Sequence, residues 1–180
     1  MTLPIKLEKV ALVVPMSNLL ALDQASRTTG WSVFIDGKLL KYGKFTVSEE
    51  DIGERLYSIK NHVQNLITEY EINEIVFEDI QLQNNVMNNV QTFKILAEVF
   101  GILEELFTEL KIPHTAVLAA SWKSTLGIKG KSRPEQKKNA QLYVEQTYNI
   151  KATQDESDSI CIGSHYLTNS KVEAGFDWSE

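Results

Sequence analysis

The chain has 180 residues, of which 43% are apolar and 23% are charged, and its formal net charge is −6. This balance is typical of one globular domain and excludes a disordered or fibrous protein. The longest apolar runs are far shorter than the roughly 20 residues that a membrane span needs, so we expect a cytoplasmic protein with no membrane partner.

The first predicted elements are three strands. Residues 1–16 are interpreted as an N-terminal extension, which could be an extra edge strand, an extended start or a remnant of expression. The apolar run NLLALD and the alternating runs GWSVFI and KLLKYGKF follow, and Asp36-Gly37 provides the positive-φ pair of a two-residue hairpin. These runs predict an antiparallel meander.

Helices and strands alternate in the rest of the chain. Apolar residues recur at helical spacing over 51–70 and, on a wider face, over 90–110. NEIVFED and HTAVLA predict two buried strands, and SWKSTLG predicts a short turn or helix. A helix with Pro134 in its first turn follows, and a last helix begins at TQDESDS. Residues 170–180 are interpreted as a C-terminal tail. The pattern predicts an α/β domain with a mixed sheet covered by helices.

Acidic residues stand where the first and fourth predicted strands end. Asp23 closes LLALD on the same face as Ala21 and Ala25, and a charge at the end of an inner strand needs a partner. Asp23 is therefore either a turn aspartate that bonds the SRTTG backbone or part of a site. Glu78 and Asp79 close the fourth strand and face opposite sides, so at most one of them can share a site with Asp23.

The last predicted helix carries a further acidic pair, Asp155 and Asp158, which are three residues apart and so lie on one helical face. Thr153 and Glu156 match a capping box, and the helix dipole favours acids near a helix start, but neither effect explains Asp158. Carboxylates gathered at one place would repel one another unless cations lay between them. With oxygen ligands and no Cys or His cluster, we expect two Mg²⁺ per site, replaceable by Mn²⁺, a pair that supports phosphodiester cleavage.

Basic residues are concentrated in one stretch, although the net charge is negative. Residues 123–138 contain six basic residues against one acidic residue, a local charge of +5, and the rest of the chain, with 12 basic and 23 acidic residues, carries −11. Such a stretch can bind a polyanion, or it can be a solvated loop.

The order of these features resembles the RuvC-type Holliday-junction resolvases of the RNase H-like superfamily, and among them a phage-encoded member. The motifs that carry the resemblance, in family order, are LLALDQASRTTGWSVF, IVFEDIQLQNNVMNNVQTFKILAEVFGIL, SWKSTLGIKG and DESDSICIG. They span residues 18–168. The resemblance implies an RNase H-like nuclease domain over residues 17–169, with helices flanking a five-stranded mixed sheet of order 3-2-1-4-5 whose strand 2 is antiparallel.

The resemblance further implies an enzyme, a homodimeric Mg²⁺-dependent endodeoxyribonuclease that resolves Holliday junctions by paired nicks and leaves 5′-phosphate and 3′-hydroxyl ends. Asp23 would bridge two metal ions, Glu78 would bind one, and Asp155 and Asp158 would complete the catalytic set. Lys123 matches a basic catalytic residue near the scissile phosphate.

A second such lysine maps to Lys137 or Lys131, because the loop lengths differ from those of the family. Together with Lys123, the predicted DNA-binding residues are Lys129, Lys131, Arg133, Lys137 and Gln81.

Two positions depart from the family pattern. Gln81 stands where many relatives carry an aromatic residue three positions after the glutamate. Because aromatic stacking stabilises an unpaired base by roughly 1 to 3 kcal/mol, its absence predicts weak sequence preference and cutting of other branched DNA, such as three-way junctions and forks. Ile160 stands where some relatives carry a histidine, and His165, seven residues after Asp158, is interpreted as a structural histidine.

Three other interpretations stay open. The chain could be a non-catalytic protein that binds branched DNA, or an RNase H-like nuclease acting on RNA/DNA hybrids. An actin-like or sugar-kinase-like ATPase also begins with a strand, an Asp and a turn. However, it needs two such domains and an early glycine in the phosphate turn, which DQASRTTG lacks.

Overall fold

The computed structural model describes residues 17–81 and 86–173. Its elements, in chain order, are β1 (Asn18–Asp23), β2 (Thr28–Ile35), β3 (Lys38–Thr46), α1 (Ile52–Glu69), β4 (Glu74–Glu78), α2 (Val86–Glu109), β5 (His114–Val117), α3 (Ala119–Thr125), α4 (Arg133–Tyr148) and α5 (Gln154–Glu173). The predicted N-terminal extension and the end of the predicted tail lie outside the described residues. Helix α2 begins before the predicted residue 90, where the sequence NNVMNN has no apolar helical repeat, and α5 includes the first residues assigned to the tail.

The five strands form one mixed sheet in the order β3-β2-β1-β4-β5. β1 pairs antiparallel with β2 and parallel with β4, and β4 pairs parallel with β5. The β2–β3 hairpin turns through Asp36 and Gly37, whose φ angles are +50° and +74°. Both the sheet order and this turn were predicted from the sequence and are confirmed. Because β1 and β4 are parallel neighbours, their carboxyl ends lie together.

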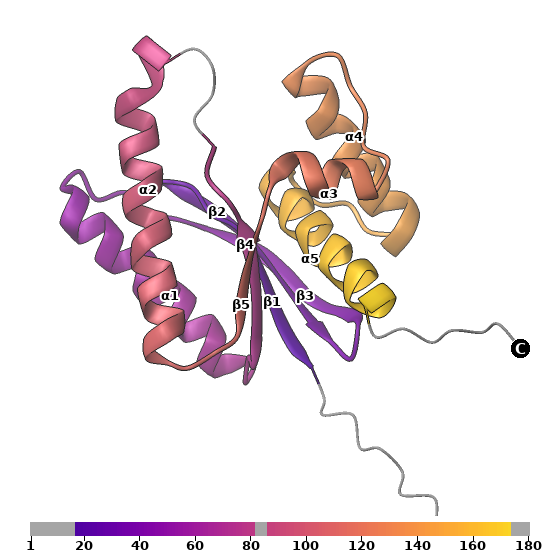
Figure 1. Ribbon diagram of the computed structural model, residues 1–180, viewed down its shortest axis with the longest axis horizontal. Coiled ribbons are helices and arrows are strands. Elements are labelled where there is room, and N and C mark those ends of the chain that lie inside the picture. The colour runs from indigo at the N-terminus through magenta and orange to yellow at the C-terminus, as the bar shows by residue number, and fades with distance from the viewer. Residues whose placement is uncertain (1–16, 82–85, 174–180) are drawn as a thin grey trace, which may run out of the picture.

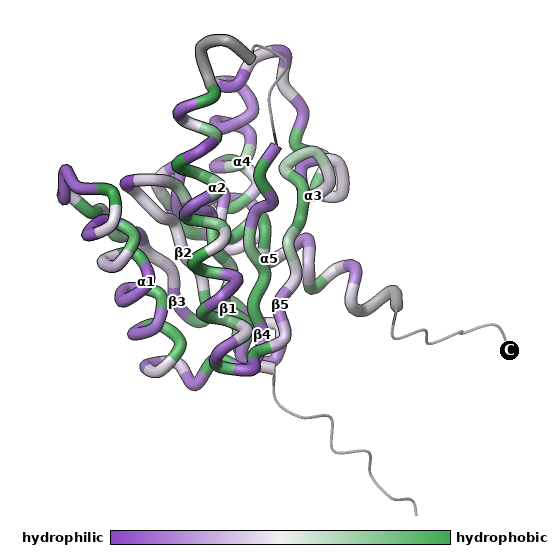
Figure 2. The backbone as a smooth tube through the Cα atoms, turned by 60° about the vertical axis from the view of Figure 1, so that its left-hand side comes forward, coloured by the Kyte–Doolittle hydropathy of each residue, from purple (hydrophilic) through white to green (hydrophobic). Residues whose placement is uncertain are grey.

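Helices cover both faces of the sheet. Figure 1 shows α1 and α2 on one side and α3, α4 and α5 on the other. The β1 side chains alternate between the two layers: Leu20 and Leu22 pack with the first layer, Leu19 and Ala21 with the second. Figure 2 shows polar and apolar residues alternating along α1 and α2, as expected of helices with one face on a sheet. No helix in the described residues is long and apolar enough to cross a membrane.

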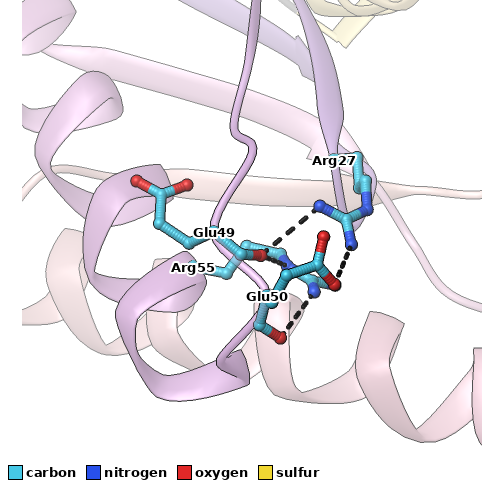
Figure 3. A network of polar contacts seen from close by, with 4 residues as sticks. All are labelled: Arg27, Glu49, Glu50 and Arg55. Atoms are coloured by element: carbon cyan, nitrogen blue, oxygen red, sulfur yellow. Dashed lines mark hydrogen bonds and ion pairs between the residues drawn. The ribbon is translucent and has the colours of Figure 1, made fainter.

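A buried arginine fastens the loop between β3 and α1 (Figure 3). Arg55 of α1 is 7% exposed; its Nε donates to the Glu49 carbonyl over 2.9 Å and its Nη2 to the Glu50 carbonyl over 3.1 Å. Arg27, just before β2, reaches the same loop and pairs with the Glu50 carboxylate at 3.4 Å. The network therefore joins the β1–β2 turn to the start of α1. Sequence reasoning missed this role, because Arg55 occupies a polar position in an amphipathic pattern.

Candidate active site

The carboxyl ends of β1 and β4 bring two acidic residues together. Asp23 follows Leu22, which pairs with Phe77, and Glu78 follows Phe77. Gln24, 8% exposed, continues this pairing with its side chain: its amide nitrogen donates to the Glu78 carbonyl, and its amide oxygen accepts the Glu78 N–H over 3.2 Å. The amide group thus takes the place of a further backbone pair, which fixes Glu78 relative to Asp23.

Helix α5 reaches this end of the sheet because β2 has no side chain at Gly30. Gly30 is the register partner of Asp23, and a Cβ built on it would lie 1.9 Å from the Asp155 carbonyl oxygen. The glycine therefore allows the first turn of α5 to rest directly on the backbone of the sheet. The predicted capping interaction helps to start the helix there, since the Glu156 carboxylate accepts the Thr153 N–H over 2.7 Å. This contact brings Asp155 and Asp158 beside Asp23.

A cavity of about 520 Å³ opens at this place and contains all four predicted acidic residues. They come from three elements: Asp23 from β1, Glu78 from β4, and Asp155 and Asp158 from α5. Asp79 lines a neighbouring cavity of about 390 Å³, so of the two adjacent acids it is Glu78 that shares the cavity with Asp23. The four carboxylates that the sequence singled out are thus neighbours in the fold.

The predicted basic residues divide into two groups. Four of them line the acidic cavity: Lys123, Lys131, Arg133 and Lys137. Lys129 is exposed on the loop before α4, outside that lining, and its carbonyl accepts from Asn139. Gln81 lines the neighbouring 390 Å³ cavity, which shares Glu78 and Arg133 with the first. The sequence offered Lys131 and Lys137 as the second lysine near the scissile phosphate. Both line the cavity, so the lining does not distinguish between them.

Burial and mutual repulsion make ionisation of the carboxyl groups in the acidic cavity unfavourable. Burial raises the pKa of Asp23 well above its ordinary value, and the negative charges of Glu78 and Asp158 raise it further. Burial also raises the pKa of Asp158 to about 6, against the opposing influence of the Lys137 ammonium 3.7 Å away. Burial raises the pKa of Glu78 as well, whereas hydrogen bonding from Trp122 and the charge of Lys123 lower it. A cation in the cavity would relieve this repulsion.

The donor set fits a hard divalent cation by its chemistry, since it consists of carboxylate oxygens. No three Asp, Glu, His or Cys side chains of residues 17–81 and 86–173 converge closely enough to form a ready-made metal cluster. Instead, two of the carboxylates pair with lysines: Asp158 with Lys137, and Asp155 with Lys44, each at 3.7 Å. Each lysine approaches only the Oδ2 atom of its partner, so the Oδ1 atoms of Asp155 and Asp158 are outside these two ion pairs.

Sequence reasoning missed three residues of the site. Gln24 was not singled out, and Trp122 and Lys44 entered only as members of the predicted segments SWKSTLG and KLLKYGKF. One signal could have indicated Gln24: it is a polar residue that directly follows a strand buried on both faces. No local signal pointed to Trp122 or Lys44, because their partners are remote in sequence. His165 is 5% exposed and lies outside the lining of both cavities, as expected of a structural histidine.

Comparison with known proteins gives one family. Residues 19–164 match the family model described as crossover junction endodeoxyribonuclease RuvC. The crossover junction endodeoxyribonuclease RuvC of Ehrlichia chaffeensis is 28% identical over 150 residues, which are 80% of this chain and 92% of that protein.

Solved structures share the fold at low identity. Thermus thermophilus RuvC in complex with a Holliday junction substrate superposes with a TM-score of 0.69 at 15% identity, covering 87% of this chain and 96% of that one. The yeast mitochondrial Holliday junction resolvase Ydc2 gives 0.62 at 14% identity, covering 89% and 82%. Fowlpox virus resolvase in complex with its junction DNA gives 0.60 at 12% identity, covering 85% and 98%.

Proposed function

The chain belongs to the RuvC family of crossover junction endodeoxyribonucleases, and from this membership we propose that it resolves Holliday junctions by nicking DNA strands. The observation that supports this most strongly is the composition of one cavity. Asp23, Glu78, Asp155 and Asp158 line it together with four cationic side chains. An acidic group of this kind suits hydrolysis of a phosphodiester, and the cations beside it suit binding of the phosphate backbone.

Each set of residues has a distinct task in this proposal. The four carboxylates would hold divalent cations, Mg²⁺ or Mn²⁺, with Asp23 at the centre of the set. When bound, such ions supply charge neutralisation and activation of water for phosphodiester hydrolysis. Lys123 would act near the scissile phosphate, and Lys131, Arg133 and Lys137 would bind the DNA backbone beside it. Phosphate contacts of this kind position a substrate by its shape and carry no base sequence.

Two cuts across one junction require two such cavities, so the proposal includes a homodimer. The products are nicks with 5′-phosphate and 3′-hydroxyl ends. Gln81 borders the cavity next to Glu78 and offers no aromatic ring for an unpaired base. The proposal therefore extends to three-way junctions and forks, with weak preference among junction sequences.

Cleavage of a synthetic four-way junction with and without Mg²⁺ tests the proposal. Asp23→Asn should abolish cutting and retain junction binding in a gel shift. Asp36→Asn is the matched control, because Asp36 lies in the hairpin at the opposite end of the sheet and Asn also adopts positive φ. Binding without cutting by the wild type would favour a non-catalytic junction binder. Preference for an RNA/DNA hybrid would favour the other RNase H-like activity, and cutting by Asp23→Asn would contradict the site.

A further inference from the structure

Trp122 contacts both an acidic and a basic residue of the cavity lining, Glu78 and Lys123. It lies in α3, is 2% exposed and belongs to the hydrophobic core beneath the cavity. Its indole N–H donates to the Glu78 Oε2 over 2.9 Å. A buried indole N–H needs an acceptor, and here the acceptor is one of the four acidic residues that line the cavity. The edge of the ring therefore fixes one oxygen of Glu78 and leaves the other to face a ligand.

The face of the same ring lies beside a cation. The Lys123 Nζ is 5.1 Å from the centre of the Trp122 ring, within the range of a cation–π contact. The Nζ also donates to the Gln136 side-chain oxygen over 3.2 Å, and the Gln136 amide nitrogen donates to the Gly130 carbonyl over 3.1 Å. The ammonium is thus placed by contacts from α3 and α4, and the loop before α4 is held by the same glutamine.

Through these contacts the Trp122 side chain holds two groups of opposite charge, the Glu78 carboxylate and the Lys123 ammonium. Glu78 is the last residue of β4, so its carboxylate could otherwise rotate toward solvent or toward Lys123. A neutral donor that is rigidly packed holds the carboxylate without competing for its charge, in contrast to the lysines that pair with Asp155 and Asp158. Hydrogen bonds to ligating carboxylates are a known means of orienting metal ligands. Glu78 is therefore already oriented before any cation or DNA binds.

We propose that Trp122 is a positioning residue for cleavage, whose ring edge holds the Glu78 carboxylate and whose ring face holds the Lys123 ammonium. This inference rests on the proposed function, because it assigns Glu78 and Lys123 their tasks in phosphodiester hydrolysis.

Binding of Mn²⁺ in the absence of DNA, followed by electron paramagnetic resonance, separates the positioning role from activity. Trp122→Phe keeps an aromatic ring and removes the N–H. We expect its Mn²⁺ affinity to fall by about 10-fold to 100-fold, the usual cost of losing a partner of a metal ligand. The Mg²⁺ concentration for half-maximal junction cutting should rise by a similar factor, while junction binding without divalent ions stays within about twofold. Trp31→Phe, on the other face of the sheet, should behave as the wild type.

If Trp122→Phe folds poorly, an isosteric analogue of tryptophan at the same position provides the test instead. 3-Benzothienylalanine at position 122 preserves the ring volume and lacks the N–H, so it should retain the thermal midpoint and still lose Mn²⁺ affinity. Wild-type Mn²⁺ affinity in the analogue would overturn the inference. If the wild type leaves junctions uncut while the analogue loses Mn²⁺ affinity, the positioning role stands and the proposed junction cleavage fails.

Discussion

Gly30 and Asp23 are register partners in the β1–β2 ladder, and the Asp155 carbonyl oxygen occupies the space where a Gly30 side chain would stand. A Cβ there would lie 1.9 Å from that oxygen, which belongs to the backbone and cannot move aside as the end of a flexible side chain could. The docking of α5 beside Asp23 therefore depends on the absence of a side chain on the neighbouring strand.

Gly30→Ala should displace the start of α5 and thereby separate Asp155 and Asp158 from Asp23. Overpacking of this kind costs about 1–3 kcal/mol of unfolding free energy, and junction cutting should be lost in variants that remain folded. Urea denaturation and the cleavage assay measure the two effects. Gly101→Ala in α2 meets no atom within 4 Å and should instead stabilise the protein by about 0.5–1 kcal/mol. A fully active Gly30→Ala protein would contradict this account of the site.

Gln24→Met should loosen the carboxyl end of β4, because it removes both hydrogen bonds to the Glu78 backbone and nearly preserves the volume. Leaving a buried N–H and carbonyl without partners costs about 1–3 kcal/mol, measurable by denaturation. Cutting should slow as well, since Glu78 is no longer fixed. Gln64→Met, at an exposed position of α1, should change stability by less than about 0.5 kcal/mol. Equal stability of the two variants would show that the Gln24 amide contributes nothing.

Arg55→Met should cost about 1–3 kcal/mol, because it removes the buried donor of the Glu50 carbonyl and leaves the Glu49 carbonyl with only the longer bond from Arg27, 3.4 Å. Arg27→Met removes an exposed ion pair with Glu50 and a 3.4 Å bond to the Glu49 carbonyl, and should cost less than about 1 kcal/mol. The comparison uses the same substitution in the same network (Figure 3), and it contrasts a buried arginine on two backbone carbonyls with a more exposed one. Equal losses, or a larger loss at Arg27, would contradict the prediction.

His165 should make the protein less stable as the pH falls below about 6.5. Burial lowers the pKa of His165, and its Nδ1 has no hydrogen-bond partner among the described residues. The unfolded chain then binds a proton that the folded chain does not, so protonation favours unfolding. His165→Gln should remove this contribution and so change the slope of stability against pH by at most about 1.4 kcal/mol per pH unit, the limit for one proton.

Comparison with the wild type is needed for this test, because Asp23, Glu78 and Asp158, whose pKa values are all raised, act in the opposite direction. The raised pKa of the Asp158 carboxyl, about 6, means that the folded state gains a proton as the pH falls and is stabilised by it. An unchanged slope of stability against pH in His165→Gln would contradict the prediction.

Arg133→Ala should weaken junction binding and reduce the salt dependence of the affinity. Loss of one phosphate contact lowers the slope of log affinity against log salt by about 1, equally for junctions of different sequence. Lys38→Ala is a matched control, since Lys38 is exposed at the far end of the sheet and should leave the slope unchanged. A loss confined to certain junction sequences would instead indicate base recognition by Arg133.

Much of the fold could be predicted because its signals are local. Asp36-Gly37 determined the hairpin, alternation placed Leu20 and Leu22 on the face opposite Ala21, and helical spacing predicted α1. The start of α2 could not be predicted, because a polar segment without apolar repeat is compatible with a loop or a helix.

Sequence reasoning found the site residues that are unfavourable at their positions in a strand or helix, and it missed those that suit their positions. Asp23 and Asp158 are unfavourable at their positions unless they have partners, so the sequence alone indicated them as site residues. Trp122 and Arg55 suit a helix whatever they contact, so their hydrogen bonds to Glu78 and to the loop carbonyls depend on tertiary structure alone. Lys44 likewise meets Asp155 only after a strand and a helix have packed.

The acidic cavity is completed by α5, the last helix along the described chain. During synthesis the ribosome releases β1 and β4 first, so a growing chain carries Asp23 and Glu78 without Asp155 and Asp158. The complete set exists only after α5 has emerged and packed over Gly30. If cleavage needs all four acids, as proposed, a growing chain would gain the ability to cut DNA only once α5 has packed onto the sheet.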